Sequence, residues 1–186
     1  YNALCNVRKG NSDGSEVQKI ELLMNTAGIS PDDRPVVAAA NQKAAETEAP
    51  AAAIELPDGR IITGKTSNLL GATSALLLNA LKELGGIDDS VDLISHEVLK
   101  PVQSLKVDVL GNHNPRLHTD ELLVALSICS VSDATAKLAM EQVGKLKNCN
   151  VHSSVILSQV DLNVLKKLGL HVTCEPVYQT KKLFHR

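Results

Sequence analysis

The chain has almost no aromatic side chains. Its 186 residues include one Phe, two Tyr and no Trp, and these three, Tyr1, Tyr178 and Phe184, all lie near the ends. The hydrophobic core must therefore be built from Leu, Ile, Val and Ala. Sites for single-stranded nucleic acid and for carbohydrate usually stack bases or sugars on aromatic faces, and residues 2–177 offer none. This composition disfavours both kinds of binding.

The remaining composition is that of an ordinary soluble globular protein. Hydrophobic residues make up 44% and charged residues 22%, and 186 residues suffice for one domain with a small appendage. The net charge is −2, and basic residues are dispersed among acidic ones. The sequence therefore predicts no positively charged patch that would bind nucleic acid or an anionic membrane. No apolar run approaches the roughly 18 to 20 residues that span a bilayer. We expect neither a nucleic acid nor a membrane as partner.

Cysteine usage and the start of the chain predict a cytoplasmic location. The four cysteines are scattered and form no Cys-x-x-Cys pair, which is typical of free thiols in a reducing compartment. The sequence begins at Tyr1 without a basic-then-apolar leader, so it carries no secretion signal. The missing initiator Met also suggests a piece of a longer protein.

Residues 1–50 predict a helical arm. Ser15 to Gln18 have the form of a capping box that opens a helix ending at Gly28. A second helix, opened by prolines and rich in alanine, follows and stops before Pro50.

Residues 51–178 predict an α/β domain. Two short β-type runs are joined by a turn at Gly59, and a long buried helix follows from Ser67. Further strands are expected at 91–94, 150–157 and 170–175, and Thr119 and Ser132 are expected to cap two of the helices. The order of elements predicts a three-layer αβα sandwich with a mixed sheet, followed by a tail at residues 179–186.

Gly59 to Thr66 match the letter of the phosphate-binding loop pattern, a glycine, four residues and Gly-Lys-Thr. The backbone of such a loop must curl inward around the phosphates. The intervening residues include adjacent Ile61 and Ile62, which favour an extended strand. A hairpin with its turn at Gly59 explains the pattern, and we interpret the match as accidental.

The segment after this strand keeps one feature of an anion site. Lys65, Thr66, Ser67 and Asn68 lie where a strand gives way to a helix, and helix N-termini attract anions. The alternative is that Ser67 only caps the helix while Lys65 is solvated. This structural alternative is favoured, since most capped helix starts bind nothing.

A second cluster combines Arg116, His118 and Asp120 at a junction between a loop and a helix. Arg116 could clamp an anionic group while His118 and Asp120 handle a proton. Alternatively, Thr119 caps the helix and Asp120 complements its dipole, which requires no ligand and is the more common arrangement.

A third group lies along the last two strands. His152 and Ser154 share one face of a strand, Cys174 and Glu175 follow the final strand, and Asp161 marks a helix start. These residues either line a cleft at the edge of the sheet or only satisfy hydrogen bonds there.

No cofactor and no metal site is predicted. His118, Asp120, His152 and Cys174 could supply metal ligands, but no pair of them has the spacing of a known zinc site. Cys129 lies in an apolar helix and is expected to be buried and inert.

Three stretches resemble the C-terminal part of an uncharacterised bacterial family, domain of unknown function 1846. They are LPDGRIITGKTSNLLGATSALLLNALKELGGI, LGNHNPRLHTDELLVALSI and HSSVILSQVDLNVLKKLGLHVTCEP, and the resemblance runs from about Tyr1 to Tyr178. It implies that this chain is the C-terminal portion of a longer protein. It assigns no catalytic role to Lys65, His118 or His152.

The resemblance also implies a topology similar to that of cytidine deaminases. Those enzymes carry a His-x-Glu or Cys-x-Glu motif where the helix after the hairpin starts, and Pro-Cys-x-x-Cys at the next helix start. This sequence has Ser67-Asn68-Leu69-Leu70 at the first place and residues 116–120 at the second. The zinc-dependent mechanism therefore lacks its ligands and its general acid.

These observations predict a small-anion-binding or assembly domain without a complete catalytic set. Its expected partners are the N-terminal portion of the same protein, an anionic small molecule and a second copy of the chain in a homo-oligomer. The alternative is part of a hydrolase or transferase whose active site is completed by the absent N-terminal portion. That alternative predicts that the polar clusters converge in one cleft, whereas a purely structural role predicts separate helix caps.

Overall fold

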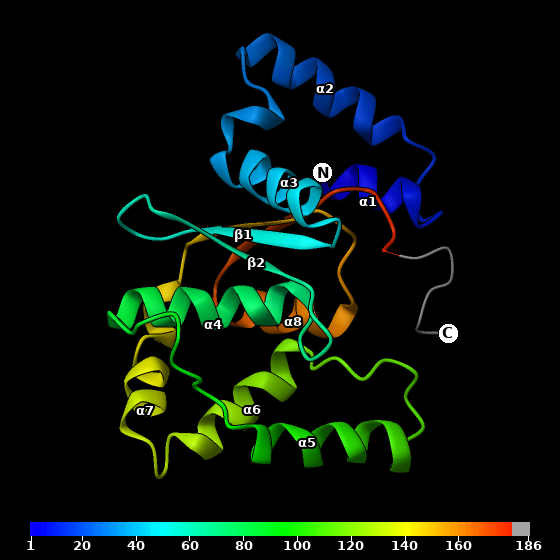
Figure 1. The fold of residues 1–186 in the computed structure, drawn as a ribbon. Helices are drawn as coiled ribbons and strands as arrows, with labels where there is room; N and C mark the ends of the chain where they lie inside the picture. The colour runs from blue at the N-terminus through cyan, green and yellow to red at the C-terminus, as the bar shows by residue number, and fades with distance from the viewer. Residues whose placement is uncertain (180–186) are drawn as a thin grey trace.

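The computed structural model describes residues 1–179 and contains one four-stranded sheet (Figure 1). The strands are β1 (Ala51–Glu55), β2 (Ile61–Lys65), β3 (Asn150–Ser153) and β4 (His171–Cys174), in the order β2-β1-β3-β4. β1 is antiparallel to both β2 and β3, whereas β3 and β4 are parallel. The mixed sheet that the sequence predicted is confirmed.

Helices cover both faces of this sheet. On one face α3 (Pro35–Thr47) packs on β1, β2 and β3, and α1 (Asn2–Arg8) contacts β4. On the other face lie α4 (Ala72–Gly85) and α8 (Gln159–Lys167) (Figure 1). The αβα sandwich is confirmed. The boundary proposed at residue 50 stays a prediction, although α3 itself forms one layer of the sandwich.

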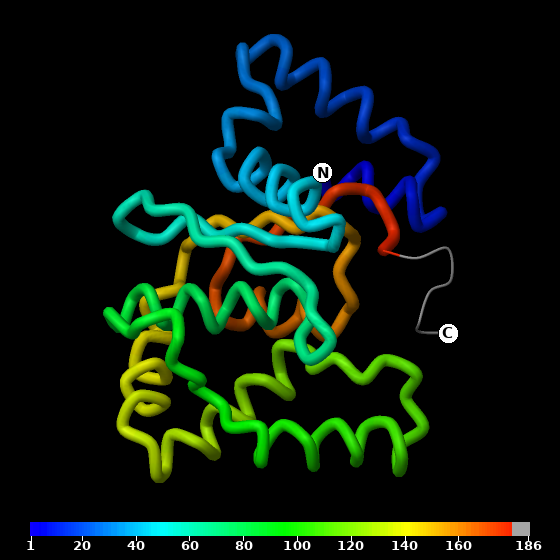
Figure 2. Tube along the Cα trace, in the orientation of Figure 1, coloured from blue at the N-terminus to red at the C-terminus, as the bar shows by residue number. Residues whose placement is uncertain are grey.

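Further helices extend the two outer sides. Below α4 lies another helical layer, and above α3 a single helix stands at the periphery, as the trace in Figure 2 shows. The lower layer consists of α5 (His96–Ser104), η2 (Leu105–Val109), α6 (Thr119–Cys129) and α7 (Ala134–Glu141), and η3 (Val143–Leu146) connects α7 to β3. The peripheral helix is α2 (Ser15–Ala27), which η1 (Pro31–Asp33) connects to α3. Within the described residues no helix is both long and apolar enough to cross a membrane.

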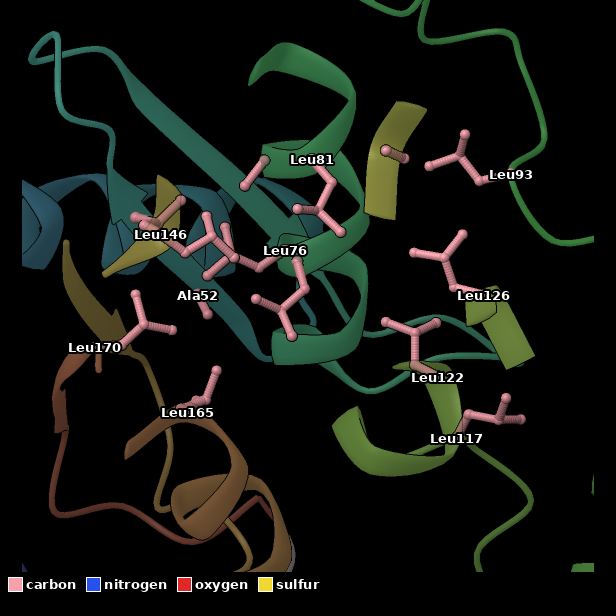
Figure 3. Close-up of a cluster of buried hydrophobic side chains, with 14 of the residues drawn as sticks. Ala52, Leu76, Leu81, Leu93, Leu117, Leu122, Leu126, Leu146, Leu165 and Leu170 are labelled. Carbon is pink, nitrogen blue, oxygen red and sulfur yellow. The ribbon is translucent and has the colours of Figure 1, made fainter. Parts of the chain in front are cut away.

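The main core is built from aliphatic side chains, as the scarcity of aromatics requires. Leucines from α4, α6 and α8 fill the space beneath the sheet, among them Leu76, Leu122 and Leu165, all fully buried (Figure 3). A smaller cluster on the opposite face joins Val36 and Ala40 of α3 to Ala53 of β1. Burial of aliphatic surface on both faces of β1 thus holds the three layers together.

The hairpin accounts for the phosphate-loop-like pattern. Gly59 has a φ of +84° in the turn, and its N–H donates to the Leu56 carbonyl. The four residues that follow lead into β2, where Ile62 lies opposite Ile54. An extended strand cannot cradle a phosphate, so the interpretation of the match as accidental is confirmed.

Several local predictions were wrong. The long helix begins at Ala72 rather than Ser67, because Ser67 Oγ accepts the Leu69 and Leu70 N–H groups in a turn of its own. Residues 91–94 form no strand and contain only a bend at residues 93 and 94.

The predicted helix caps were also displaced by one residue. Gly14, His118 and Asp133 stand at the N-caps where Ser15, Thr119 and Ser132 were expected. Residues 180–186 of the predicted tail lie outside the described residues.

Candidate functional site

Two of the three predicted clusters lie side by side. Leu70 and Leu117 form an isolated parallel bridge, and the Leu117 N–H donates to the Leu69 carbonyl at 2.9 Å. Arg116 Nε donates to the Ser67 carbonyl oxygen at 2.7 Å. The segment after β2 is therefore tied to the segment before α6, although the two are about fifty residues apart in the sequence.

A cavity of about 140 Å³ opens where these segments meet the start of α8. Its polar lining comes from four separate parts of the chain. The polar residues that line it include Thr66, Thr73, Arg116, His118, Ser158 and Asp161.

The buried carboxylate of Asp161 lines this cavity and accepts several hydrogen bonds. Asp161 Oδ2 lies 3.0 Å from His118 Nδ1 and accepts from Ser158 Oγ at 2.7 Å. The other oxygen, Oδ1, accepts from the backbone N–H of Thr119 at 2.9 Å and from the Thr119 hydroxyl at 3.0 Å. Asp161 thus joins the N-terminus of α6 to that of α8 and fixes the orientation of the His118 ring.

This geometry changes both pKa values in the pair. The hydrogen bond to Asp161 raises the pKa of His118 above its ordinary value, against the opposing effect of burial. Burial alone would raise the pKa of Asp161, but the hydrogen bonds from His118, Thr119 and Ser158 outweigh it and lower that pKa. An ionised Asp161 beside a protonated His118 is the favoured state over a widened pH range.

The N-terminus of α4 opens onto the same cavity. Its N-cap is Gly71, so no side chain caps this helix of 14 residues, and Ala72 and Thr73 of the first turn line the cavity. The backbone N–H groups of a first helical turn lack partners within the helix and carry a partial positive charge. They add to the charges of Arg116 and His118.

A second cavity, of about 210 Å³, lies on the other side of His118 and is lined by Asp120, Glu121 and Lys106 among others. Lys106 is buried and donates to Glu121 Oε2 at 2.7 Å and to the Arg116 carbonyl at 2.6 Å. Glu121 Oε2 also accepts from the His118 N–H at 2.8 Å. These bonds fix the backbone of residues 116–118 and hence the direction of both cationic side chains.

The predicted residues of the first two clusters thus fall into three places. Thr66, Arg116 and His118 line the first cavity, and Asp120 lines the second. Lys65 and Asn68 are exposed and line neither cavity, and Ser67 contributes its carbonyl to Arg116.

The third cluster is divided: Asp161 lines the first cavity, whereas His152 lies elsewhere, on the sheet face that α3 covers. His152 is fully buried, with Nδ1 2.8 Å from Thr173 Oγ1 and Nε2 3.3 Å from Glu175 Oε1. The Tyr1 ring meets the imidazole edge to face, with centroids 4.7 Å apart. Burial lowers the pKa of His152, against the opposing effect of Glu175. This is the environment of a neutral core histidine.

Ser154 and Cys174, two further members of that cluster, also have structural roles. Ser154 Oγ accepts the Ala51 N–H at 3.0 Å at the end of the β1–β3 pairing. Cys174 is buried, and burial raises the pKa of its thiol to about 11. None of His152, Ser154, Cys174 and Glu175 lines the cavity beside Arg116.

Sequence reasoning missed two functions in the site. Asp161 was expected at a helix start, with a place in a cleft left open, but its contact with His118 was not predicted, and Ser158 and Thr73 were not singled out. The spacing Ser158-x-x-Asp161 is that of a capping box and could have located the helix start, but not the contact with His118, 43 residues away. In the part of the chain that the structure describes, no group of three His, Cys, Asp or Glu side chains could hold a metal ion.

Comparison with known proteins places these residues in a family. A family model described as "Domain of unknown function DUF1846, C-terminal" matches residues 32–184. UPF0371 proteins from Streptococcus pyogenes serotype M5 (strain Manfredo) and serotype M3 (strain SSI-1) are each 50% identical to this chain over all 186 residues. A UPF0371 protein from Streptococcus uberis is 48% identical over the same length. The chain spans 38% of the length of each of these relatives.

Proposed function

The chain belongs to the DUF1846 family, whose C-terminal domain matches residues 32–184, and we propose that it supplies a binding site for a small anion to a larger cytoplasmic protein. The site is the cavity of about 140 Å³ beside Arg116. Four free, buried cysteines fit the reducing compartment that this proposal includes.

The observation that carries the proposal is the convergence of three positive groups. The Arg116 guanidinium, the His118 imidazole with its raised pKa and the first turn of α4 all face one cavity. Asp161, the acid in its lining, is already matched by His118 and by the Thr119 and Ser158 donors. Because the charges of His118 and Asp161 offset each other, Arg116 and the first turn of α4 give the cavity its net positive potential, which suits an oxyanion.

The size of the cavity narrows the class of ligand. Sites for drug-sized molecules usually enclose about 300 to 1,000 Å³, and this cavity is smaller. A phosphate, sulfate or carboxylate group fits such a volume, whereas a whole nucleotide would need more space. The hydroxyl groups of Thr66 and Thr73 add donors on the side of α4.

The proposal is tested by thermal unfolding with and without sulfate, whose charge does not change over the pH range of protein stability. A ligand at about a hundred times its Kd should stabilise the fold by about 2.7 kcal/mol. Arg116→Met keeps much of the aliphatic stem and removes the charge, so the stabilisation should disappear. Lys65→Met removes an exposed charge outside the cavity and should leave it intact. Equal stabilisation of wild type and Arg116→Met would refute the proposed site.

One geometric feature favours a second candidate, a hydrolase or transferase completed by the rest of the larger protein. A carboxylate on Nδ1, as Asp161 provides for His118, fixes the tautomer of an imidazole and supports proton transfer by the ring. Because the chain spans 38% of its relatives, the assay belongs with a full-length Streptococcus pyogenes relative.

That assay uses p-nitrophenyl phosphate and p-nitrophenyl acetate as probes. Turnover that is lost when the residue aligned with His118 is replaced by Gln, and retained when the residue aligned with Lys65 is replaced by Met, would support the enzyme. Equal turnover in wild type and the His118-equivalent variant would exclude it for these reactions.

A further inference from the structure

Helix α2 buries none of its 13 residues. Val17 and Met24 are half-buried, and the rest of the helix is exposed. Leu22 and Leu23 are 67% and 68% exposed, although neither has a polar atom in its side chain. A helix normally buries one apolar face, and a solvated face carrying two adjacent leucines is costly.

The inner side of α2 is also incompletely packed. A groove of about 340 Å³ separates α2 from α1 and from the residues before α3. Its lining is largely apolar and includes Leu4, Val17, Ile20, Met24 and Ile29. In Figure 1 α2 stands on the outer side of α3, at the far end of the molecule from α5 and α7. Leu22 and Leu23 do not line the groove, so apolar side chains are left uncovered on both sides of the helix. The groove and these two leucines are here named together the α2 surface.

The α2 surface lies outside the part of the chain that the C-terminal family model matches. The C-terminal family model begins at residue 32, directly after this segment. The streptococcal relatives nevertheless match the chain from its first residue and are much longer, since the chain makes up 38% of their length. Residues 1–31 thus correspond to a part of the relatives that precedes their C-terminal domain.

We propose that the α2 surface, formed by Leu22, Leu23 and the groove between α1 and α2, is a docking surface for the preceding portion of the longer protein. The occupant is the apolar surface of that portion, which surrounds α2, fills the groove on one side and covers Leu22 and Leu23 on the other. Docking there would bury the leucines that this chain exposes, and it explains why the helix keeps apolar side chains that no element among residues 1–179 covers.

The test compares cysteine labelling in two proteins. Leu23→Cys in this chain should react rapidly with a water-soluble maleimide, because the position is 68% exposed and the four native cysteines are buried. In a full-length Streptococcus pyogenes relative, a cysteine at the aligned position should react at least about tenfold more slowly, because labelling then requires local opening. The control is Lys137→Cys on α7, an exposed polar position far from α2, which should label equally in both.

A second measurement separates docking from local rearrangement. Leu23→Asp should leave the Tm of this chain unchanged and lower the Tm of the full-length relative that carries it at the aligned position. Equal labelling rates at position 23 in both proteins would overturn the proposal. Slow, concentration-dependent labelling of this chain together with a dimer in size-exclusion chromatography would also overturn it, because the occupant would then be a second copy.

Discussion

Gly64 of β2 lies directly against the backbone of Leu76 in α4. A Cβ atom at position 64 would stand 2.2 Å from the Leu76 nitrogen and 2.8 Å from the Ala75 carbonyl carbon. Backbone atoms cannot move away as a flexible side chain can, so this contact between strand and helix requires a glycine. The second glycine of the phosphate-loop-like pattern, Gly64, is thus explained by the packing of α4 on β2.

We therefore expect Gly64→Ala to destabilise the protein by about 3 kcal/mol, because the methyl group must push α4 away from the sheet. Urea denaturation monitored by circular dichroism measures the free energy of unfolding. Gly144→Ala is the matched control: nothing lies within 4 Å of an added Cβ there, and its φ is not positive. A stability change below about 0.5 kcal/mol is expected for the control. Similar values for the two variants would contradict the close approach.

Asp161→Ala should also be strongly destabilising. It leaves the buried N–H and hydroxyl of Thr119 without their acceptor, and each unsatisfied buried donor costs about 1 to 3 kcal/mol. We expect a loss of about 3 kcal/mol in the free energy of unfolding. The control Asp120→Ala removes an exposed carboxylate in the first turn of the same helix and should cost about 0.5 kcal/mol. A small effect of Asp161→Ala would show that Thr119 finds another acceptor.

The parts of the fold that follow local rules could be predicted from the sequence. The turn at Gly59 and the adjacent isoleucines predicted the hairpin, and the absence of central aromatics predicted the leucine-rich core. Predicted helix boundaries were wrong where a side chain could form either of two local structures. Serine is a favoured residue at helix N-caps, so Ser67 was expected to begin the helix. Its hydroxyl instead accepts hydrogen bonds within a separate turn, and the helix begins five residues later.

The candidate site was predictable only in part, for a different reason. Arg116 and His118 stood out because charged residues gathered in one short segment. Their partners come from distant segments: Asp161 is 43 residues beyond His118, and Ser67 is 49 residues before Arg116. Such contacts depend on how α6 and α8 pack, which no local pattern encodes. Conversely, His152 was a candidate site residue because it is polar, but the structure buries it fully beneath α1 and α3.

Cys174 should be unreactive in the folded protein. Its thiol is buried, with a pKa of about 11, so almost no nucleophilic thiolate exists at neutral pH. Alkylation with iodoacetamide followed by peptide mass spectrometry should modify Cys174 only after unfolding in denaturant. The exposed cysteine of a Lys137→Cys variant supplies the positive control. Rapid modification of Cys174 in the native protein would show that β4 and α1 separate readily.

The His118–Asp161 pair should make stability depend on pH in a defined direction. The folded-state pKa of His118 is raised, so its contribution is fully present below the unfolded-state pKa and is lost as pH rises through the folded-state pKa. Compared with wild type, His118→Gln should therefore be clearly less stable near about pH 5.5, and the difference should shrink by about pH 8.5.

The neighbouring charges do not alter this sign. Lys106 and Glu121, which act on His118 in opposite directions, are present in both proteins, as is His152, whose lowered pKa destabilises both in acid. The lowered pKa of Asp161 keeps its carboxylate ionised throughout this range, and its contribution is lost only in stronger acid. Tm measured at intervals of pH for wild type and His118→Gln gives the difference directly. A difference that grows with rising pH would mean that His118 is held neutral, and would remove its charge from the proposed anion site.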